Sequence, residues 1–317
     1  MKVTEHLAKA SNPLISFELI PPKRGGDIRQ ILNVLDDIIK YNPPFIDITS
    51  HAAEVMYEET PNGEVQMKVK RKRPGTLGIC ALIQNKYNVD AVPHVICHNF
   101  TREETEDFLI ELHYLGIENV LAIRGDDNGY QKPIKFGRST NEYAVDLIKQ
   151  IANMNSGQYL ESSLLDAKPM NFSIGAGCYP EKHFEAPNLR TDIRYTKKKM
   201  EAGAEYLVTQ MFYDNKSYFE YVELCRKEGI DIPIIPGLKI MTSKNHVHNL
   251  PKYFHIDIPA DLAEEVEKAD PKHVLDIGVE WTVKQVEDLL NHNVPAIHFY
   301  VMLDSKPINA VMKKLKL

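Results

Sequence analysis

A single acidic side chain interrupts an apolar stretch near the start of the chain, ISFELIPPK, residues 15–23. Ile15, Phe17 and Leu19 favour a β-strand, and the two prolines that follow end it because proline cannot donate to a sheet ladder. Glu18 therefore lies either on a solvated side of the strand or in the protein interior. A buried carboxylate must be paired or protonated, and a carboxyl that stays protonated near neutral pH can act as a general acid.

Polar residues also end several other apolar runs of the chain. If these runs are strands of one parallel barrel, their carboxyl ends meet at one face, where such side chains contact substrate. For any single residue, an ordinary inward-facing or loop role is an equal alternative, and the coincidence across several strands is the stronger argument for a site. The residues at these positions are Glu18, Thr49, His94, Asp126, Tyr179, Gln210 and Tyr300.

Two loops carry further groups of this kind. In AIRGDDNG, Arg124, Gly125 and Asp126 can act as a unit, since glycine lets a ligand approach the backbone between two charges. An ordinary turn after a strand is the alternative. In GCYPEKHFEAP, residues 177–187, Tyr179 and His183 can lie over a planar ligand.

A metal site and a phosphate site are both weak possibilities. His94 and Cys97 in HVICH point to opposite faces of a strand, so they cannot converge on one ion, and no metal is expected. Lys197, Lys198 and Lys199 follow one another on a predicted helix and cannot share a face, so most of them should be solvated. One of them can still reach a phosphate.

Alternating strands and helices position these residues. Helices are predicted over 27–40, 102–115, 189–202 and 215–228, and Gly116, Gly203 and Gly229 are placed to end three of the helices in a left-handed conformation. Alternation of this kind implies a parallel sheet, and eight units indicate an α/β fold of the (β/α)8 TIM-barrel type. Irregular insertions are expected over 52–75, after the second strand, and from about 242 to 275. Strands are predicted over 14–20, 45–50, 91–97, 119–125, 172–178, 206–212, 232–238 and 296–302.

Bulk composition narrows the class of protein. The chain has 317 residues, which suits one catalytic barrel domain over 1–317, and its net charge of -6 provides no basic footprint for nucleic acid or an anionic membrane. There is no apolar leader, no stretch long enough for a membrane span and no CxxC among the four cysteines. We therefore expect a soluble cytoplasmic protein with a small-molecule partner.

Several motifs, in their order and spacing over residues 14–302, resemble methylenetetrahydrofolate reductases, flavoproteins that make methyltetrahydrofolate for methionine synthesis. The resemblance implies a barrel that holds FAD at its carboxyl face and resembles the short bacterial form without a regulatory domain. It also implies a homo-oligomer and a reaction in which NAD(P)H reduces the flavin and leaves before 5,10-methylenetetrahydrofolate takes the hydride. The motifs are SFELIPP, AVPHVIC, NVLAIRGD, YPEKHFEA, KKKMEAGAEYLVTQMFYD, IPIIPGL and IHFY.

The resemblance also implies roles for individual residues. Glu18 matches the acid that protonates N10 of the substrate, and burial in an apolar barrel would raise its pKa. Asp126 would stabilise the cationic iminium, and Gln210 and Tyr300 would contact the folate. The residues implied in FAD binding are Thr49, His94, Arg124, Gly125, Asp126, Tyr179, His183, Asp192, Lys198 and Lys199.

The chain departs from the family pattern at two substrate positions. Lys244 stands where the family usually has an aromatic residue, and Asp304 stands where arginine is common. The basic stretch KVKRKR, residues 68–73, suggests a contact for a polyglutamate tail. Two other functions fit parts of the pattern: another FAD-linked barrel oxidoreductase, similar to proline dehydrogenase, or a catalytically silent barrel that serves as a binding partner.

Overall fold

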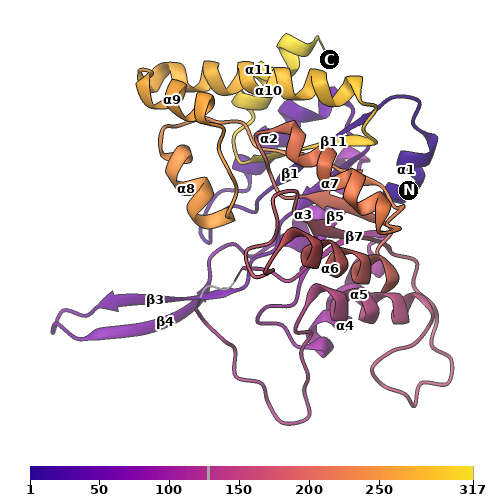
Figure 1. Ribbon diagram of the computed structural model, residues 1–317. Helices are drawn as coiled ribbons and strands as arrows, with labels where there is room; N and C mark the ends of the chain where they lie inside the picture. The colour runs from indigo at the N-terminus through magenta and orange to yellow at the C-terminus, as the bar shows by residue number, and fades with distance from the viewer. Residues whose placement is uncertain (127–128, 317) are drawn as a thin grey trace.

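The computed structural model describes residues 1–126 and 129–316, and the chain forms a parallel barrel surrounded by helices (Figure 1). The nine strands of its main sheet run in the order β10-β11-β1-β2-β5-β6-β7-β8-β9, and all their pairs are parallel. The two end strands of this order, β9 and β10, are consecutive in the chain and separated only by Pro236, so they share one position and close the barrel at eight positions. The bounds are β1 (Leu14–Leu19), β2 (Phe45–Ile48), β5 (Asp90–Ile96), β6 (Asn119–Ile123), β7 (Ser173–Cys178), β8 (Tyr206–Thr209), β9 (Ile234–Ile235), β10 (Gly237–Leu238) and β11 (Ala296–Met302).

The predicted (β/α)8 fold is therefore confirmed, and so are the helices that connect its strands. Gly116, Gly203 and Gly229 follow α4, α6 and α7 with φ angles of 71°, 122° and 79°, as helix-terminating residues do. Thr101 and Glu104 form a capping box at the start of α4. The outer helices are α2 (Arg29–Ile38), α3 (Thr76–Leu82), α4 (Arg102–Tyr114), α5 (Ala144–Asn155), α6 (Leu189–Glu201), α7 (Asn215–Lys227), α10 (Val274–Asn291) and α11 (Lys306–Leu315), with the short turns η1 (Ile39–Tyr41) and η2 (Ile83–Tyr87).

The insertion after β2 is not irregular, so that prediction was wrong. It forms an antiparallel hairpin of β3 (Ala53–Glu59) and β4 (Val65–Arg71), which projects away from the barrel in Figure 1. Val55, Tyr57, Met67 and Val69 lie on one face of the hairpin, where Tyr57 and Met67 are exposed, whereas Glu54, Glu58, Lys68 and Lys70 lie on the other. Successive side chains of a paired strand point to opposite faces, so a segment with many charged residues can still form a regular hairpin.

The stretch from 242 to 275 also contains regular structure, which corrects the second expectation of an irregular segment. It folds into α8 (Asn245–Phe254), α9 (Ala260–Lys268) and the turn η3 (Pro271–His273). Their apolar residues form a separate cluster with Met211, Tyr213 and Met241. These helices lie beside the carboxyl ends of the late strands, so they border the same face as the site.

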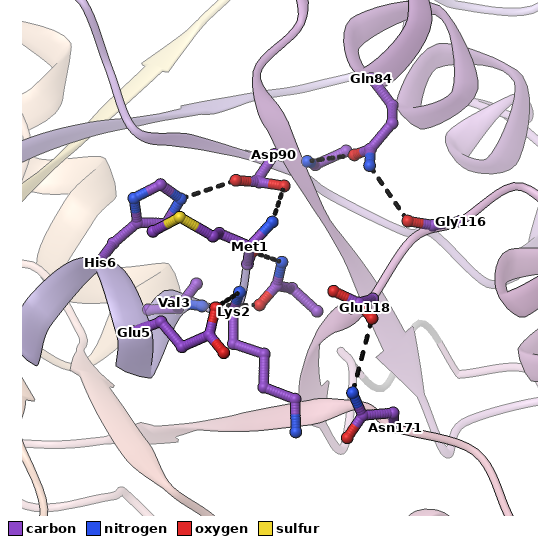
Figure 2. Close-up of polar contacts among 12 residues, drawn as sticks. Met1, Lys2, Val3, Glu5, His6, Gln84, Asp90, Gly116, Glu118 and Asn171 are labelled. Carbon is purple, nitrogen blue, oxygen red and sulfur yellow. Dashed lines mark hydrogen bonds and ion pairs between the residues drawn. The ribbon is translucent and has the colours of Figure 1, made fainter.

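The helix α1 (Val3–Lys9) packs Val3 and Leu7 against the apolar residues at the amino-terminal end of the barrel. Figure 2 shows the polar contacts of Met1, Val3 and His6 there. The amino group of Met1 lies 2.7 Å from Oδ1 of Asp90, and Nε2 of His6 lies 2.6 Å from Oδ2 of the same carboxylate. The backbone N–H of Val3 donates to Oδ1 of Asn119 at 2.8 Å, and Val3 packs into the apolar cluster that fills this end of the barrel. The opposite end, where the polar strand ends gather, is therefore the face open to a ligand.

Candidate active site

A layer of polar side chains lies inside the barrel, next to the apolar cluster that fills its amino-terminal end. Glu18 comes from β1, Asp47 from β2, His94 from β5 and His298 from β11, and their exposed fractions are 7%, 1%, 4% and 0%. Each side chain faces the barrel interior, since the four approach one another from adjacent strands within 3.4–3.9 Å. Four neighbouring strands thus bring two carboxylates and two imidazoles together in the interior.

The four side chains approach one another without good hydrogen-bond geometry. Nε2 of His94 lies 3.4 Å from Oε2 of Glu18 and 3.6 Å from Oδ2 of Asp47. Nε2 of His298 lies 3.8 Å from Glu18 Oε2, and its Nδ1 shares a contact of 2.9 Å with Oγ of Ser16. Nε2 of both histidines and both carboxylate oxygens of Asp47 are buried without a hydrogen-bond partner among the described residues. Buried groups of this kind are typical of functional sites rather than of stable cores.

The surroundings of Glu18 differ from those predicted. Burial raises the pKa of Glu18, but the charges of His94, His298 and Lys239 outweigh it, so that its pKa is lowered overall. The expectation that an apolar environment raises this pKa was therefore wrong. Burial lowers the pKa of His94, but Glu18 and Asp47 outweigh burial and raise it. A shared proton is thus favoured on His94, next to the carboxylate of Glu18.

Tyr300 and Gln210 border this layer on the side of β8 and β11. The hydroxyl of Tyr300 donates to the carbonyl oxygen of Thr209 at 2.5 Å, and Oε1 of Gln210 accepts from the N–H of Met211 at 2.9 Å. Nζ of Lys239 donates to the carbonyl oxygen of Tyr300 at 2.9 Å. Burial lowers the pKa of Lys239 to about 8, although Glu18 and Asp304 act in the opposite direction.

A second cluster lies at the ends of β6 and β7. The rings of Tyr179 and His183 meet edge to face at 4.6 Å, and the N–H of His183 donates to Oδ2 of buried Asp192 at 3.0 Å. Nζ of Lys199 donates to the carbonyl oxygen of Gly177 at 2.7 Å and lies 5.7 Å from the Tyr179 ring. Cations and aromatic rings in this arrangement suit a ligand with a phosphate group and a flat ring.

Arg124 and Gly125 join this cluster from β6. The guanidinium of Arg124 forms an ion pair with Glu185 and lies 5.6 Å from the Tyr143 ring. Gly125 has a φ of 87°, and a Cβ atom there would lie 3.2 Å from Cβ of Ile96. Glycine is therefore required at this position both by backbone conformation and by space.

The three remaining predicted residues, Thr49, Asp126 and Lys198, differ in burial. Thr49 is buried beside the polar layer, and its Oγ1 lies 3.0 Å from Nε2 of His51. Asp126 is exposed and lines a cavity at the barrel mouth. Lys198 is exposed, with its ammonium 5.7 Å from the ring of Tyr195, so the structure brings Lys199 to the cluster and leaves Lys198 outside it.

Lys244 and Asp304, the two residues that depart from the family pattern, lie near the late strands. Nζ of Lys244 donates to the carbonyl oxygen of Glu267 at 2.8 Å, which ties the start of α8 to α9. Asp304 lines a cavity of about 260 Å³ together with Lys239, Thr242, His246 and Tyr300. The late strands thus border a largely apolar cavity whose lining includes one lysine and one aspartate.

No group of three or more His, Cys, Asp or Glu side chains in the described parts of the chain is arranged to hold a metal ion. His94 faces the barrel interior, whereas Sγ of Cys97 lies 3.5 Å from the carbonyl oxygen of Ile123 and packs in the outer core. The predicted opposition of these two side chains is therefore confirmed. Among the described helices, none combines the length and apolar character that crossing a membrane requires.

Sequence reasoning missed Asp47, His298 and Lys239. Asp47 stands two residues before Thr49, and His298 two residues before Tyr300, so each shares a strand face with a residue that was selected. This period of two was the available signal. No pattern in the sequence indicated Lys239, because its burial depends on segments that are distant in the chain.

The chain is similar in sequence to one family of enzymes. A family model described as methylenetetrahydrofolate reductase matches residues 2–316. "Methylenetetrahydrofolate reductase 1" of Schizosaccharomyces pombe is 28% identical over 310 residues, which are 95% of this chain and 46% of that protein. "5,10-methylenetetrahydrofolate reductase" of Buchnera aphidicola subsp. Baizongia pistaciae is 28% identical over 306 residues, 95% of this chain and 91% of that protein. The chain spans about half the length of the first curated relatives it matches.

A solved structure supports the fold alone. An uncharacterized protein from Clostridium thermocellum, described as binding two copies of 5-methyl-5,6,7,8-tetrahydrofolic acid, aligns with a TM-score of 0.57. The alignment covers 98% of this chain and 96% of that one, at 12% sequence identity.

Proposed function

The chain belongs to the methylenetetrahydrofolate reductase family, and from this premise we propose that it reduces 5,10-methylenetetrahydrofolate to 5-methyltetrahydrofolate with NAD(P)H and a bound FAD. Family membership supports the substrate and the reaction. The cluster at the ends of β6 and β7 supports flavin binding, and the polar layer around Glu18 supports donation of a proton.

The residues at the ends of β6 and β7 fit the proposed flavin. Arg124 and Lys199 provide positive charge for a diphosphate, and the rings of Tyr179 and His183 provide a flat apolar contact. Gly125 leaves the backbone open to close approach. Buried Asp192 fixes the loop by accepting from His183, and we assign Thr49, which follows β2, and His94, from β5, to the same flavin site. A bound flavin would accept a hydride from the pyridine nucleotide and supply one to the folate.

Glu18 is the proposed proton donor to N10 of the substrate. Protonation of N10 allows the bond between N10 and the bridging carbon to break, which leaves an iminium at N5 that accepts the hydride and becomes the methyl group. Because the shared proton is favoured on His94 in the free protein, we propose that Nε2 of His94 resupplies Oε2 of Glu18 across 3.4 Å. His94 and Glu18 thus keep a proton available in a closed interior.

Other residues of the mouth have proposed roles in substrate binding. The carboxylate of Asp126 would stabilise the positive charge that develops at N5, since it is the acidic residue at the end of β6. Gln210 would contact the pterin from the end of β8 and Tyr300 from β11, which lies opposite β6 in the strand order. These roles predict loss of folate turnover without loss of the fold.

The burial of Glu18 between His94 and His298 is the observation that carries this proposal. We would load the protein with FAD and follow its absorbance without oxygen, first after NADH and then after methylenetetrahydrofolate. In Glu18→Gln, reduction by NADH should change by less than roughly twofold, while reoxidation by folate should slow by roughly 100-fold or more. The matched control is Glu111→Gln, an exposed change on α4.

Two outcomes of this experiment would contradict the proposal. If Glu18→Gln slows both half-reactions equally, Glu18 positions the flavin and is not the acid. If the unaltered protein binds no FAD, the proposed reaction is wrong. Three properties stay predictions: a homo-oligomer, a cytoplasmic location and a single domain. Light scattering during size-exclusion chromatography tests whether the protein forms a homo-oligomer.

A further inference from the structure

The β3–β4 hairpin leaves the barrel as an arm with an exposed apolar face (Figure 1). Tyr57 and Val65 are 70% and 69% exposed on this face, and Met67 is 58% exposed. Val55 and Val69 pair with each other on the same face, one step nearer the barrel. A two-stranded hairpin is only marginally stable by itself, and apolar side chains gathered in this way mark a surface that another molecule covers.

The base of the arm is fixed to the barrel. Nε of Arg71 donates to the carbonyl oxygen of His51 at 2.7 Å, and Nδ2 of Asn99 donates to that of Ala53 at 3.3 Å. These contacts come from the segments on both sides of the hairpin and from the loop after β5. The arm therefore has a defined direction, and a surface that is held in place loses less entropy on binding than a mobile one.

The two ends of the arm carry opposite charge. Glu59 and Glu64 lie at the tip, beside the turn, and neither forms an ion pair with another described residue. At the base, Nζ of Lys72 lies 3.6 Å from Oε1 of Glu54. Four other cations at the base form no ion pair within residues 1–126 and 129–316, and they are Lys23, Arg24, Arg71 and Arg73. The tip is thus acidic and the base is basic.

Two copies of such an arm are complementary when they stack face to face and point in opposite directions. Each strand has seven residues and spans about 20 Å, so the tip of one arm then lies beside the base of the other. A twofold axis between the row of Val55 and Val69 and the row of Tyr57 and Met67 packs each row on the other row of the second copy. The same axis brings an acidic tip to a basic base at both ends.

We infer that the apolar face of the β3–β4 arm binds the same face of a second copy of this chain, with the two arms antiparallel. A contact of this kind uses one surface twice and closes as a dimer. An anionic lipid surface fits this arm less well, because the acidic tip is its most distant part and would be repelled. The inference does not depend on the proposed reaction.

The first test removes apolar side chains from the arm. Tyr57→Ser combined with Met67→Ser should fold, since both side chains are exposed, and Tyr114→Ser combined with Leu165→Ser is the control, with 80% and 96% exposure elsewhere. Sedimentation velocity of the full chain at micromolar concentrations gives the mass, and circular dichroism checks the fold. We expect the unaltered protein and the control to dimerise equally, and the arm variant to dimerise at least about 100-fold more weakly.

The second test exchanges charge between the two ends. Glu59→Lys with Glu64→Lys makes the tip basic, and Lys23→Glu with Lys72→Glu adds acidic side chains to the base. Each variant alone should dimerise at least about tenfold more weakly, because the attraction between tip and base is lost. An equimolar mixture of the two variants should dimerise again, since a basic tip then meets the altered base and an acidic tip meets the unaltered one.

Three results would overturn the inference. The first is an unaltered protein with the mass of one chain, 36.2 kDa, or an oligomer whose mass the arm variant leaves unchanged. The second is a mixture of the charge variants that associates no better than each variant alone. The third is a monomer that binds vesicles of phosphatidylserine and phosphatidylcholine through Tyr57 and Met67, which would assign the face to a lipid surface.

Discussion

Nε2 of His94 lies 3.4 Å from Oε2 of Glu18, and the barrel encloses both side chains almost completely. An acid and a base at this distance in a closed interior titrate as a pair rather than as two independent groups. Asp47 adds a second negative charge 3.6 Å from the same nitrogen. The charge of Asp47 therefore helps to decide at which pH the pair loses its shared proton.

Asp47→Asn should move the pH dependence of the folate half-reaction to lower pH. Without the carboxylate, the raised pKa of His94 falls, so the network releases its proton sooner as pH rises. We expect the folate step to slow by about tenfold above neutral pH and much less below pH 6, while flavin reduction by NADH is unchanged. Rapid-mixing absorbance measurements across the pH range check this. An equal loss at every pH would mean that Asp47 serves only to hold the barrel together.

Lys199→Met should weaken FAD binding, whereas Lys198→Met should have little effect. The Lys199 ammonium is buried against the Tyr179 ring and burial lowers its pKa, while Lys198 is exposed on the next position of α6. Loss of a charged contact to a phosphate costs about 2 kcal/mol, which is roughly a 30-fold change in Kd. Titration of apoprotein with FAD, followed by flavin fluorescence, gives both constants. Equal losses in the two variants would contradict the different placement of these lysines.

The sequence predicted the barrel well because the local signals of strands and helices agreed. Each apolar run ended in a turn or a polar residue, and Gly116, Gly203 and Gly229 marked helix ends. The hairpin over 53–71 was missed because its charged residues suggested a loop, although Tyr57 and Met67 pair on one face and Glu58 and Lys68 lie on the other. High charge and strand periodicity are compatible when one face of a strand is solvated.

Site residues were predicted from polar residues toward the carboxyl ends of strands, such as Glu18 and His94, and from the family resemblance, which added Lys199 on α6. Asp47 and His298 lie within apolar runs and were not selected. The direction of the Glu18 pKa also depended on His94 of β5, on His298 of β11 and on Lys239, which follows β10, and all three lie far away in the sequence. Electrostatics of this kind depends on distances across the barrel, which a single sequence does not give.

Gly125→Ala should destabilise the fold and weaken FAD binding at the same time. The residue has a φ of 87°, and the added Cβ would meet Ile96 at 3.2 Å. Gly63→Ala is a matched control, because Gly63 has a φ of 80° at the hairpin turn with nothing within 4 Å of an added Cβ. Both changes should cost about 1 kcal/mol for the left-handed backbone, and Gly125→Ala about 1 kcal/mol more for the contact. Denaturant unfolding and FAD titration measure the two effects, and only Gly125→Ala should alter the second.

Glu181 gives the protein a pH-dependent contribution to stability near neutral pH. It follows β7, and its Oε2 accepts from the backbone N–H of Asp257 at 2.8 Å. Burial, together with the carboxylates of Asp257 and Asp214, raises the pKa of Glu181 to about 7. The folded protein therefore binds this proton more tightly than the unfolded chain does. The resulting stabilisation is fully present below the ordinary value of 4.5 and is lost as pH rises through about 7.

Glu181→Gln should consequently raise the free energy of unfolding more at pH 8 than at pH 5. The amide keeps an acceptor for the N–H of Asp257 but carries no charge, so it avoids the cost of ionising a half-buried group beside two carboxylates. We expect the difference in unfolding free energy between variant and unaltered protein to rise by about 1 kcal/mol over this range, after allowance for solvent screening. Urea unfolding at several pH values measures it, with exposed Glu142→Gln as the control. A difference that stays constant with pH would show that Glu181 is already ionised at the lower end, and that the contact with Asp257 outweighs its burial.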